Sequence, residues 1–124
     1  RVYVSRKKVE RRHLRNEAEL VPILEQFGIR RVYLEGKDIR EQIKLFLQTT
    51  ELVAPHGAGL TNALFMPRGA KVLEIRPAYR SGQFCFTKLC AVRGHAHEVL
   101  VPPQQREFRV SPATLAERLR YWRA

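Results

Sequence analysis

The sequence predicts an α/β fold in which a parallel sheet of five strands carries helices on both faces. Two observations support this: short apolar runs recur along the chain, and stretches with helical apolar spacing separate most of them. Strands joined through single helices form right-handed βαβ units, and such units build a parallel sheet. The 124 residues fit one core, and an apolar content of 44% supports a folded chain. Residues 1–124 are therefore expected to form a single Rossmann-like domain.

The strands and helices can be placed in order along the chain. Strands are expected over residues 2–4, 32–34, 52–54, 72–75 and 97–101. Helices are expected to begin at or near Asn16, Asp38, Gly59, Phe84 and Ser111. Asn16 and Asp38 are good N-cap residues, and each has a Glu three positions later, which is the spacing of a capping box. Pro112 suits the first position of the last helix.

Apolar stripes support these helices, with one complication. Helical spacing relates Leu20, Ile23, Leu24 and Phe27 in the first, Ile39, Ile43, Phe46 and Leu47 in the second, and Leu115, Leu119 and Trp122 in the last. Pro22 disturbs the first helix, because an interior proline removes a hydrogen bond and clashes one turn back. That helix therefore either begins near Glu19 or bends at Pro22, and it ends at Gly28.

Residues 52–65 have the pattern strand, tight turn, helix. Pro55 ends an apolar run, and His56, Gly57 and Gly59 follow it. Glycines let a ligand approach the backbone, and the unpaired N–H groups at a helix start attract an anion such as phosphate. His56 could donate to a phosphate oxygen or shuttle a proton. On this pattern alone, a purely structural turn is an equal alternative.

A cationic run follows the first strand, since six of the ten residues from 6 to 15 are Lys or Arg. Arg6 is the preferred phosphate ligand because a guanidinium forks onto two oxygens, with a solvated loop as the alternative. Short connections favour the strand order 2-1-3-4-5, which places the first and third strands side by side. Arg6 and His56 then meet where the order reverses, and open sheets bind ligands at that crevice.

The sequence leaves two possible roles for each of two polar residues, Asn16 and Glu74. Asn16 could point into the site, although capping suits it better. Glu74 is an acid in an apolar run, so it either pairs with a cation or accepts from a ligand hydroxyl. Gln42 is interpreted as part of a polar helix face.

The charge favours anionic partners. Twenty-three Lys and Arg against twelve Asp and Glu give +11, which suits nucleic acid, acidic lipid or phosphorylated small molecules. Cys85 and Cys90 are interpreted as free thiols in a reducing compartment. No run approaches the ~18 apolar residues of a membrane span, and no secretory signal is visible. Because the chain starts at Arg1 in an expected strand, we expect it to be a piece of a longer protein.

Several motifs together resemble glycosyltransferase family 61. They are Arg6 with Arg11-Arg12, Asn16-Glu17, Glu41-Gln42, Pro55-His56-Gly57-Ala58-Gly59-Leu60-Thr61-Asn62 and Leu73-Glu74-Ile75, in matching order over residues 1–95. The resemblance implies a hexosyl- or pentosyltransferase that moves a sugar, with inversion, from a nucleotide sugar such as a UDP-sugar to a glycan or protein hydroxyl. It implies a GT-B architecture in which this chain is the carboxyl-terminal, donor-binding half. It also implies that the protein is a family member of the bacterial capsular polysaccharide type.

The resemblance also implies roles for individual residues. Arg6, Arg11, Arg12 and Asn16, the amides of Gly57, Ala58 and Gly59, and the side chains of His56, Thr61, Asn62 and Glu74 would hold the nucleotide sugar. No cofactor and no obligatory metal are expected, because prearranged cations and amides stabilise a leaving diphosphate. The general base is expected from the missing amino-terminal half, with His56 as the alternative. The isolated chain should then bind nucleotide without transferring sugar.

Two other functions compete with this one. A nucleic-acid binder fits the charge, but the basic residues spread over several elements and no known recognition motif appears, so no nucleic-acid partner is expected. A non-catalytic Rossmann-like assembly module is the second. Contact with a membrane surface stays open. A bacterial origin implies the cytoplasm or the inner membrane face, and a eukaryotic origin implies the secretory lumen.

Overall fold

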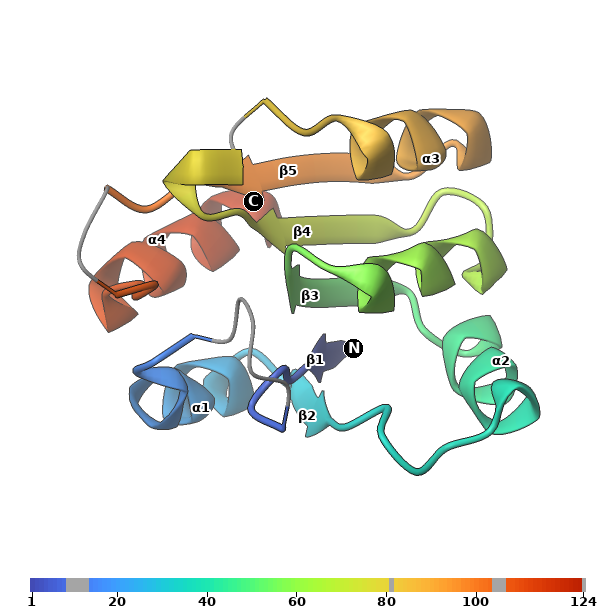
Figure 1. Ribbon diagram of the computed structural model, residues 1–124, viewed down its shortest axis with the longest axis horizontal. Helices are drawn as coiled ribbons and strands as arrows, with labels where there is room; N and C mark the ends of the chain where they lie inside the picture. Colours follow the sequence, from blue (N-terminus) through green and yellow to red (C-terminus); the bar gives the residue numbers. More distant parts are fainter. Residues whose placement is uncertain (9–13, 81, 104–106, 124) are drawn as a thin grey trace.

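Five strands form one parallel sheet in the computed structural model, which describes residues 1–8, 14–80, 82–103 and 107–123. The strands are β1 (Val2–Val4), β2 (Arg30–Val32), β3 (Glu51–Pro55), β4 (Lys71–Ile75) and β5 (Ala96–Leu100). They lie in the order β2-β1-β3-β4-β5 (Figure 1). Each neighbouring pair is parallel. The predicted fold class and the predicted strand order are both confirmed.

Helices cover the two faces of this sheet (Figure 1). They are α1 (Glu17–Gln26), α2 (Ile39–Leu47), α3 (Cys85–Arg93), α4 (Pro112–Arg123) and the 3-10 helices η1 (Ala58–Phe65) and η2 (Ala78–Arg80). Side chains of α1 and α4 join one hydrophobic cluster, whereas side chains of α2, η1 and α3 join the other. The sheet therefore lies between two helical layers, and its carboxyl edge is left to loops.

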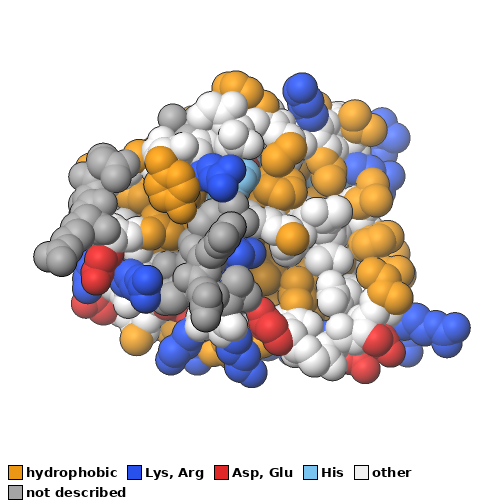
Figure 2. Space-filling model, viewed as in Figure 1, with side chains coloured by type: hydrophobic (Ala, Val, Ile, Leu, Met, Phe, Trp, Pro, Cys, Tyr) orange, Lys and Arg blue, Asp and Glu red, His pale blue; other side chains and the backbone are white. Residues whose placement is uncertain are grey.

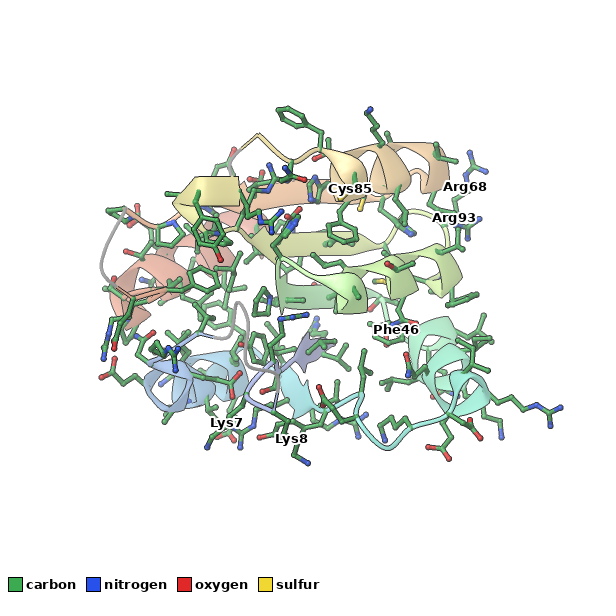
Figure 3. All side chains as sticks on the ribbon, in the orientation of Figure 1. Lys7, Lys8, Phe46, Arg68, Cys85 and Arg93 are labelled. Atoms are coloured by element: carbon green, nitrogen blue, oxygen red, sulfur yellow. The ribbon has the colours of Figure 1, made fainter. Side chains whose placement is uncertain are left out.

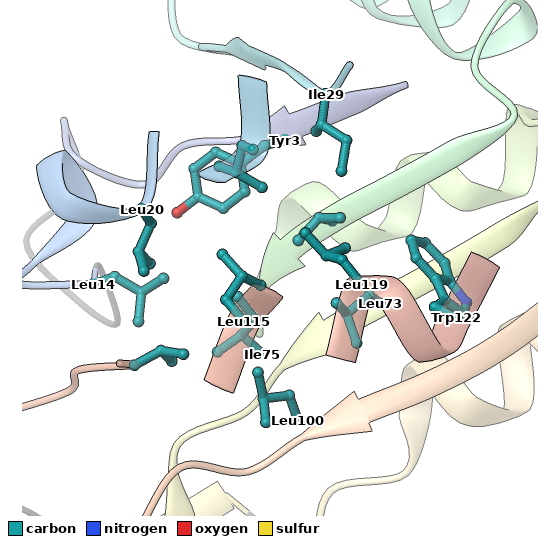
Figure 4. Close-up of a cluster of buried hydrophobic side chains, with 13 residues drawn as sticks. Tyr3, Leu14, Leu20, Ile29, Leu73, Ile75, Leu100, Leu115, Leu119 and Trp122 are labelled. Carbon is teal, nitrogen blue, oxygen red and sulfur yellow. The ribbon is translucent and has the colours of Figure 1, made fainter. Parts of the chain in front are cut away.

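The first cluster shows why the last helix belongs to the domain. Leu115, Leu119 and Trp122 of α4 pack with Leu73 and Ile75 of the inner strand β4 (Figure 4). Both leucines of α4 are fully buried, and each such burial contributes roughly 1.5–3 kcal/mol. The predicted stripe is thus confirmed. The Ser111 cap is confirmed as well, since its Oγ accepts from Thr114 N at 3.1 Å.

Two strands are displaced from their predicted positions. β2 ends at Val32, where the run 32–34 was expected to begin, because its register pairs Val2 with Arg30 and Val4 with Val32. As an edge strand it leaves Arg30 and Arg31 exposed, so its apolar pattern is weak. β5 begins at Ala96, one residue earlier than predicted, and ends at Leu100.

The predicted capping box at Asn16 is wrong. Asn16 lies at the N-cap, but its side chain caps no backbone group of α1. Its Nδ2 donates to Glu19 Oε2 at 2.9 Å and to Val110 O at 2.6 Å, and its Oδ1 accepts from Val110 N at 3.2 Å. Asn16 therefore ties α1 to the segment before α4. The helix begins at Glu17, not near Glu19, and it includes Pro22.

The second helix is capped as predicted, but its stripe is only partly buried. Asp38 Oδ1 accepts from Glu41 N at 2.8 Å. Of the four apolar positions, Phe46 alone is fully buried, while Ile39 and Leu47 are 61% and 57% exposed. The expectation that the whole stripe faces the core is therefore wrong. Phe46 is the fully buried α2 residue in the hydrophobic cluster, and α2 packs against η1.

No helix in the described part of the chain is long and apolar enough to cross a bilayer.

Candidate functional site

A cleft of about 400 Å³ lies where the strand order reverses, beside the carboxyl ends of β1 and β3. It is lined by Val4, Ser5, Arg6, Leu34, Glu35, Gln42, Ala58, Gly59 and Asn62. Four of these residues, Arg6, Ala58, Gly59 and Asn62, were predicted as site residues. The cleft is therefore at the place where open α/β sheets bind ligands.

Arg6 and Gly57 are in direct contact in this region. A Cβ on Gly57 would lie 2.7 Å from Arg6 Cζ and closer still to its Nη1. The backbone of Gly57 is extended, with φ 161° and ψ −179°, a conformation open to other residues. The glycine is thus required by space, because the guanidinium occupies the volume of its missing side chain. The predicted convergence of Arg6 and the glycine turn is confirmed, whereas phosphate binding stays a prediction.

The start of η1 leaves backbone donors for a ligand. The first hydrogen bond of this helix runs from Leu60 N to Gly57 O at 3.0 Å. Within the described residues, the N–H groups of Gly57, Ala58 and Gly59 donate to no other backbone group. Gly59 also lets the helix approach the sheet, since a Cβ there would lie 3.2 Å from Val4 Cγ1. Three adjacent amides and one guanidinium therefore lie together, and of these residues Arg6, Ala58 and Gly59 line the cleft.

Asn62 and Thr61 occupy different environments. Asn62 is 7% exposed, and its Nδ2 donates to Gly59 O at 3.2 Å and to Gln42 Oε1 at 3.3 Å. It thereby holds the first turn of η1 against α2. Thr61 is exposed and does not line the cleft. Gln42, which we interpreted as a polar face residue, belongs instead to the cleft wall.

Glu74 is a fully buried carboxylate with three cationic or protonatable partners. Its Oε2 accepts from Arg76 Nε at 2.9 Å and lies 2.6 Å from His56 Nδ1. Its Oε1 accepts from Arg76 Nη2 at 3.0 Å and lies 3.0 Å from His97 Nε2. Burial by itself would raise the pKa of Glu74, but the hydrogen bonds from His97, Arg76 and His56 outweigh burial and bring it to about 2.

Two roles were left open for Glu74, and the structure confirms the first: Glu74 pairs with a cation, Arg76. Contact with a ribose hydroxyl stays a prediction, and both carboxylate oxygens already accept hydrogen bonds from protein groups. The sheet register explains the cluster. Glu74 lies beside Ala54 in β3, His97 lies beside Val72, two residues before Glu74, and alternate residues of a strand share a face.

His56 is held on three sides. Its backbone N–H donates to Ile75 O at 2.8 Å, which continues the pairing of β3 with β4 by one residue. Its Nδ1 meets Glu74, and its ring packs edge-on against Phe86 of α3, with centroids 5.2 Å apart. At 4% exposed, the ring is fixed in one orientation.

Of the remaining predicted residues, Asn16 lies outside this cluster. Asn16 is buried against Val110, so a ligand contact from it stays a prediction. Arg11 and Arg12 lie outside the described residues. Arg76 and His97 were not predicted as site residues. A signal existed, because parallel pairing of the fourth and fifth strands brings their polar positions to one face.

The cysteines are free, as predicted, with Cys85 exposed and Cys90 buried on α3. Burial raises the pKa of Cys90 to about 11.

Among the described residues, no group of three His, Cys, Asp or Glu is arranged to hold a metal ion. Metal independence stays a prediction.

Among the residues that the structure describes, basic side chains do not concentrate at the cleft. Figure 2 shows Lys and Arg around much of the outline of one face, with apolar side chains between them. In Figure 3, Lys7 and Lys8 lie near the loop after β1, whereas Arg68 and Arg93 lie together at the other end of the molecule. The charge of +11 is therefore spread over several elements.

Comparisons with known proteins agree with the motifs. The family described as Glycosyltransferase 61 matches residues 1–73. A protein O-linked-mannose beta-1,4-N-acetylglucosaminyltransferase 2 from Canis lupus familiaris is 40% identical over 73 residues, which are 56% of this chain and 13% of the relative. An EGF domain-specific O-linked N-acetylglucosamine transferase from Drosophila melanogaster is 33% identical over 95 residues, which are 74% of this chain and 18% of the relative. The chain thus spans less than a fifth of the length of these curated relatives. It belongs to the glycosyltransferase 61 family.

Proposed function

We propose that this chain binds the nucleotide-sugar donor of an inverting glycosyltransferase, with the diphosphate at the cleft between β1 and β3. One observation carries the proposal: the Arg6 guanidinium lies on Gly57, beside the three amides that open η1. A guanidinium and adjacent backbone N–H groups are the donors that suit a diphosphate. Asn62 and Gln42 line the same cleft and offer side-chain hydrogen bonds to the sugar or phosphate.

In this proposal the site acts on the leaving group. Negative charge develops on the diphosphate as the bond to the sugar breaks, and fixed donors stabilise that charge without reorganising. The cation and the amides would do this without an obligatory metal. The general base for the acceptor hydroxyl would come from the amino-terminal half of a GT-B enzyme, and this chain alone would bind the donor without transferring sugar.

The donor and acceptor classes follow from the relatives. Both named relatives transfer N-acetylglucosamine and carry O-linked in their names. We therefore propose UDP-N-acetylglucosamine as the donor to test first, which makes the enzyme a hexosyltransferase, and a protein-linked acceptor. The capsular role and the compartment stay predictions.

Titration calorimetry with UDP, GDP and CMP tests the proposal. We expect saturable one-site binding of UDP, and a loss of at least tenfold in affinity for Arg6→Ala, because a charge-assisted hydrogen bond contributes about 1.5–3 kcal/mol. Gly57→Val should have a similar effect, since its side chain requires the space of the guanidinium. Arg120→Ala on α4 removes the same charge from an exposed position on the other helical layer and should leave UDP affinity unchanged.

Two results would contradict the proposal. Absence of UDP binding, with Arg6→Ala and Gly57→Val both silent, would favour an assembly module. Binding of DNA or RNA that weakens steeply with salt and is equally affected by Arg6→Ala and Arg120→Ala would favour a nucleic-acid binder. The spread of basic residues speaks against the latter.

A further inference from the structure

The Glu74 carboxylate determines where two histidines carry their protons. An ionised carboxylate only accepts hydrogen bonds. Arg76 donates to both of its oxygens, at 2.9 and 3.0 Å. The two remaining contacts, from His56 Nδ1 at 2.6 Å and His97 Nε2 at 3.0 Å, therefore require a proton on each of those nitrogens. Neutral His56 is then the Nδ1–H tautomer, and neutral His97 is the Nε2–H tautomer.

The other ring nitrogen of His56 is left available. In the part of the chain that the structure describes, the buried side-chain polar atoms without a partner are Arg93 Nε, His95 Nδ1 and Trp122 Nε1. His56 Nε2 is not one of them, and the described residues make no hydrogen bond to it. The residue after His56 is Gly57, on which Arg6 lies. The backbone of His56 is thus joined directly to the glycine against which Arg6 packs.

Resting on the proposed donor-binding function, we infer that Glu74 is a positioning residue that presents His56 Nε2 as a proton acceptor to a hydroxyl of the bound nucleotide sugar. Arg76 and His97 hold the carboxylate in the required orientation. Neutral His56 offers a lone pair at Nε2, so it meets a hydroxyl rather than a phosphate oxygen, which accepts hydrogen bonds and does not donate them. This assignment differs from the phosphate-donor role that the sequence indicated for His56.

The tautomers can be measured without any ligand. Long-range ¹⁵N–¹H correlation spectra of the chain should show His56 protonated at Nδ1 and His97 at Nε2. His95 provides an internal control, because its Nε2 donates to Ala63 O at 2.8 Å and does not contact Glu74. Glu74→Gln should shift His56 and His97 toward a mixture of tautomers and leave His95 unchanged. Glu98→Gln on β5 is the matched control, since that partly exposed carboxylate pairs with Arg118 instead.

Binding measurements identify the hydroxyl. With UDP-N-acetylglucosamine, Glu74→Gln and His56→Phe should each lower affinity about five- to tenfold, the effect of one lost hydrogen bond. If UDP alone shows the same loss, the hydroxyl belongs to the ribose; if UDP is unaffected, it belongs to the sugar.

Two results would overturn the inference: a neutral His56 that carries its proton at Nε2 in the wild-type chain, or unchanged His56 signals in Glu74→Gln. If Glu74→Gln does not fold, the tautomers of the wild-type chain and the affinity of His56→Phe still test the inference. Failure of the proposed function appears separately, as wild-type chain that has the predicted tautomers but binds neither UDP nor UDP-N-acetylglucosamine.

Discussion

Two buried glutamates on opposite faces of the sheet have different surroundings. Glu17, at the start of α1, accepts from the hydroxyls of Tyr3 and Ser5 at 2.8 and 2.9 Å and pairs at 3.4 Å with Arg31, whose side chain is 33% exposed. Glu74 accepts instead from a buried arginine and lies against two histidines. Glu17 fastens a helix to the sheet through two hydroxyls and one partly exposed arginine. Glu74 gathers ionisable groups at the sheet edge where a ligand is expected, which is a feature of functional sites.

The largest expected difference between the two is in stability. Glu74→Leu should lower the free energy of unfolding by about 3–5 kcal/mol, because Arg76 is 3% exposed and loses its carboxylate. Glu17→Leu should cost less, about 1–3 kcal/mol, because the groups left behind are two hydroxyls and a partly exposed Arg31. Urea denaturation at pH 7 measures both. Equal losses would mean that the two clusters do not differ as their charges suggest.

Acid should act through Glu74. Its pKa is about 2 in the folded chain against an ordinary value of 4.5, so its contribution to stability is complete above pH 4.5 and is lost as the pH falls toward 2. The loss should be on the order of 3 kcal/mol. Urea denaturation from pH 6 to pH 2 should show this loss in the wild-type chain and not in Glu74→Gln. An identical acid profile for the two chains would contradict the assignment.

The smallest effect is expected at alkaline pH, on the Glu17 side. Burial, with the nearby Glu17 carboxylate, raises the pKa of Tyr3 well above 10. Above pH 10 the unfolded chain releases this proton and the folded chain keeps it, so stability falls as the pH rises. Tyr3→Phe should cost about 1 kcal/mol at pH 7 through the lost hydrogen bond and should flatten the decline above pH 10. Guanidinium denaturation at pH 7, 9 and 10.5 measures both.

The parts of the fold that the sequence predicts correctly are those with strong local signals. β3 and β4 are apolar runs buried on both faces, and Asp38 and Ser111 cap their helices through their own side chains. β2 overlaps its apolar run only at Val32, because register with β1, not side-chain pattern, decides where this edge strand begins. Asn16 has the spacing of a capping box, but Val110, 94 residues away, takes its side chain. Rules based on neighbouring residues cannot predict a contact between residues so far apart in the sequence.

The candidate site divides in the same way. The pairing of Arg6 with the glycine turn follows from strand order, which short connections predict. The Glu74 cluster needs more, because it depends on the relative register of β3, β4 and β5. The sequence pattern predicts that Glu74 lies in one strand and that His97 begins another strand. It does not predict the register between these strands, which brings the two side chains together.

The contact between Arg6 and Gly57 couples two positions that are 51 residues apart. The backbone at Gly57 is open to any amino acid, and the three atoms nearest to an added Cβ all belong to Arg6, so the arginine excludes a side chain there. Among homologous chains, those that replace the arginine should therefore be free to lose the glycine, while those that keep it should not. Covariation between these two columns of an alignment would register a steric rule that neither column reveals by itself.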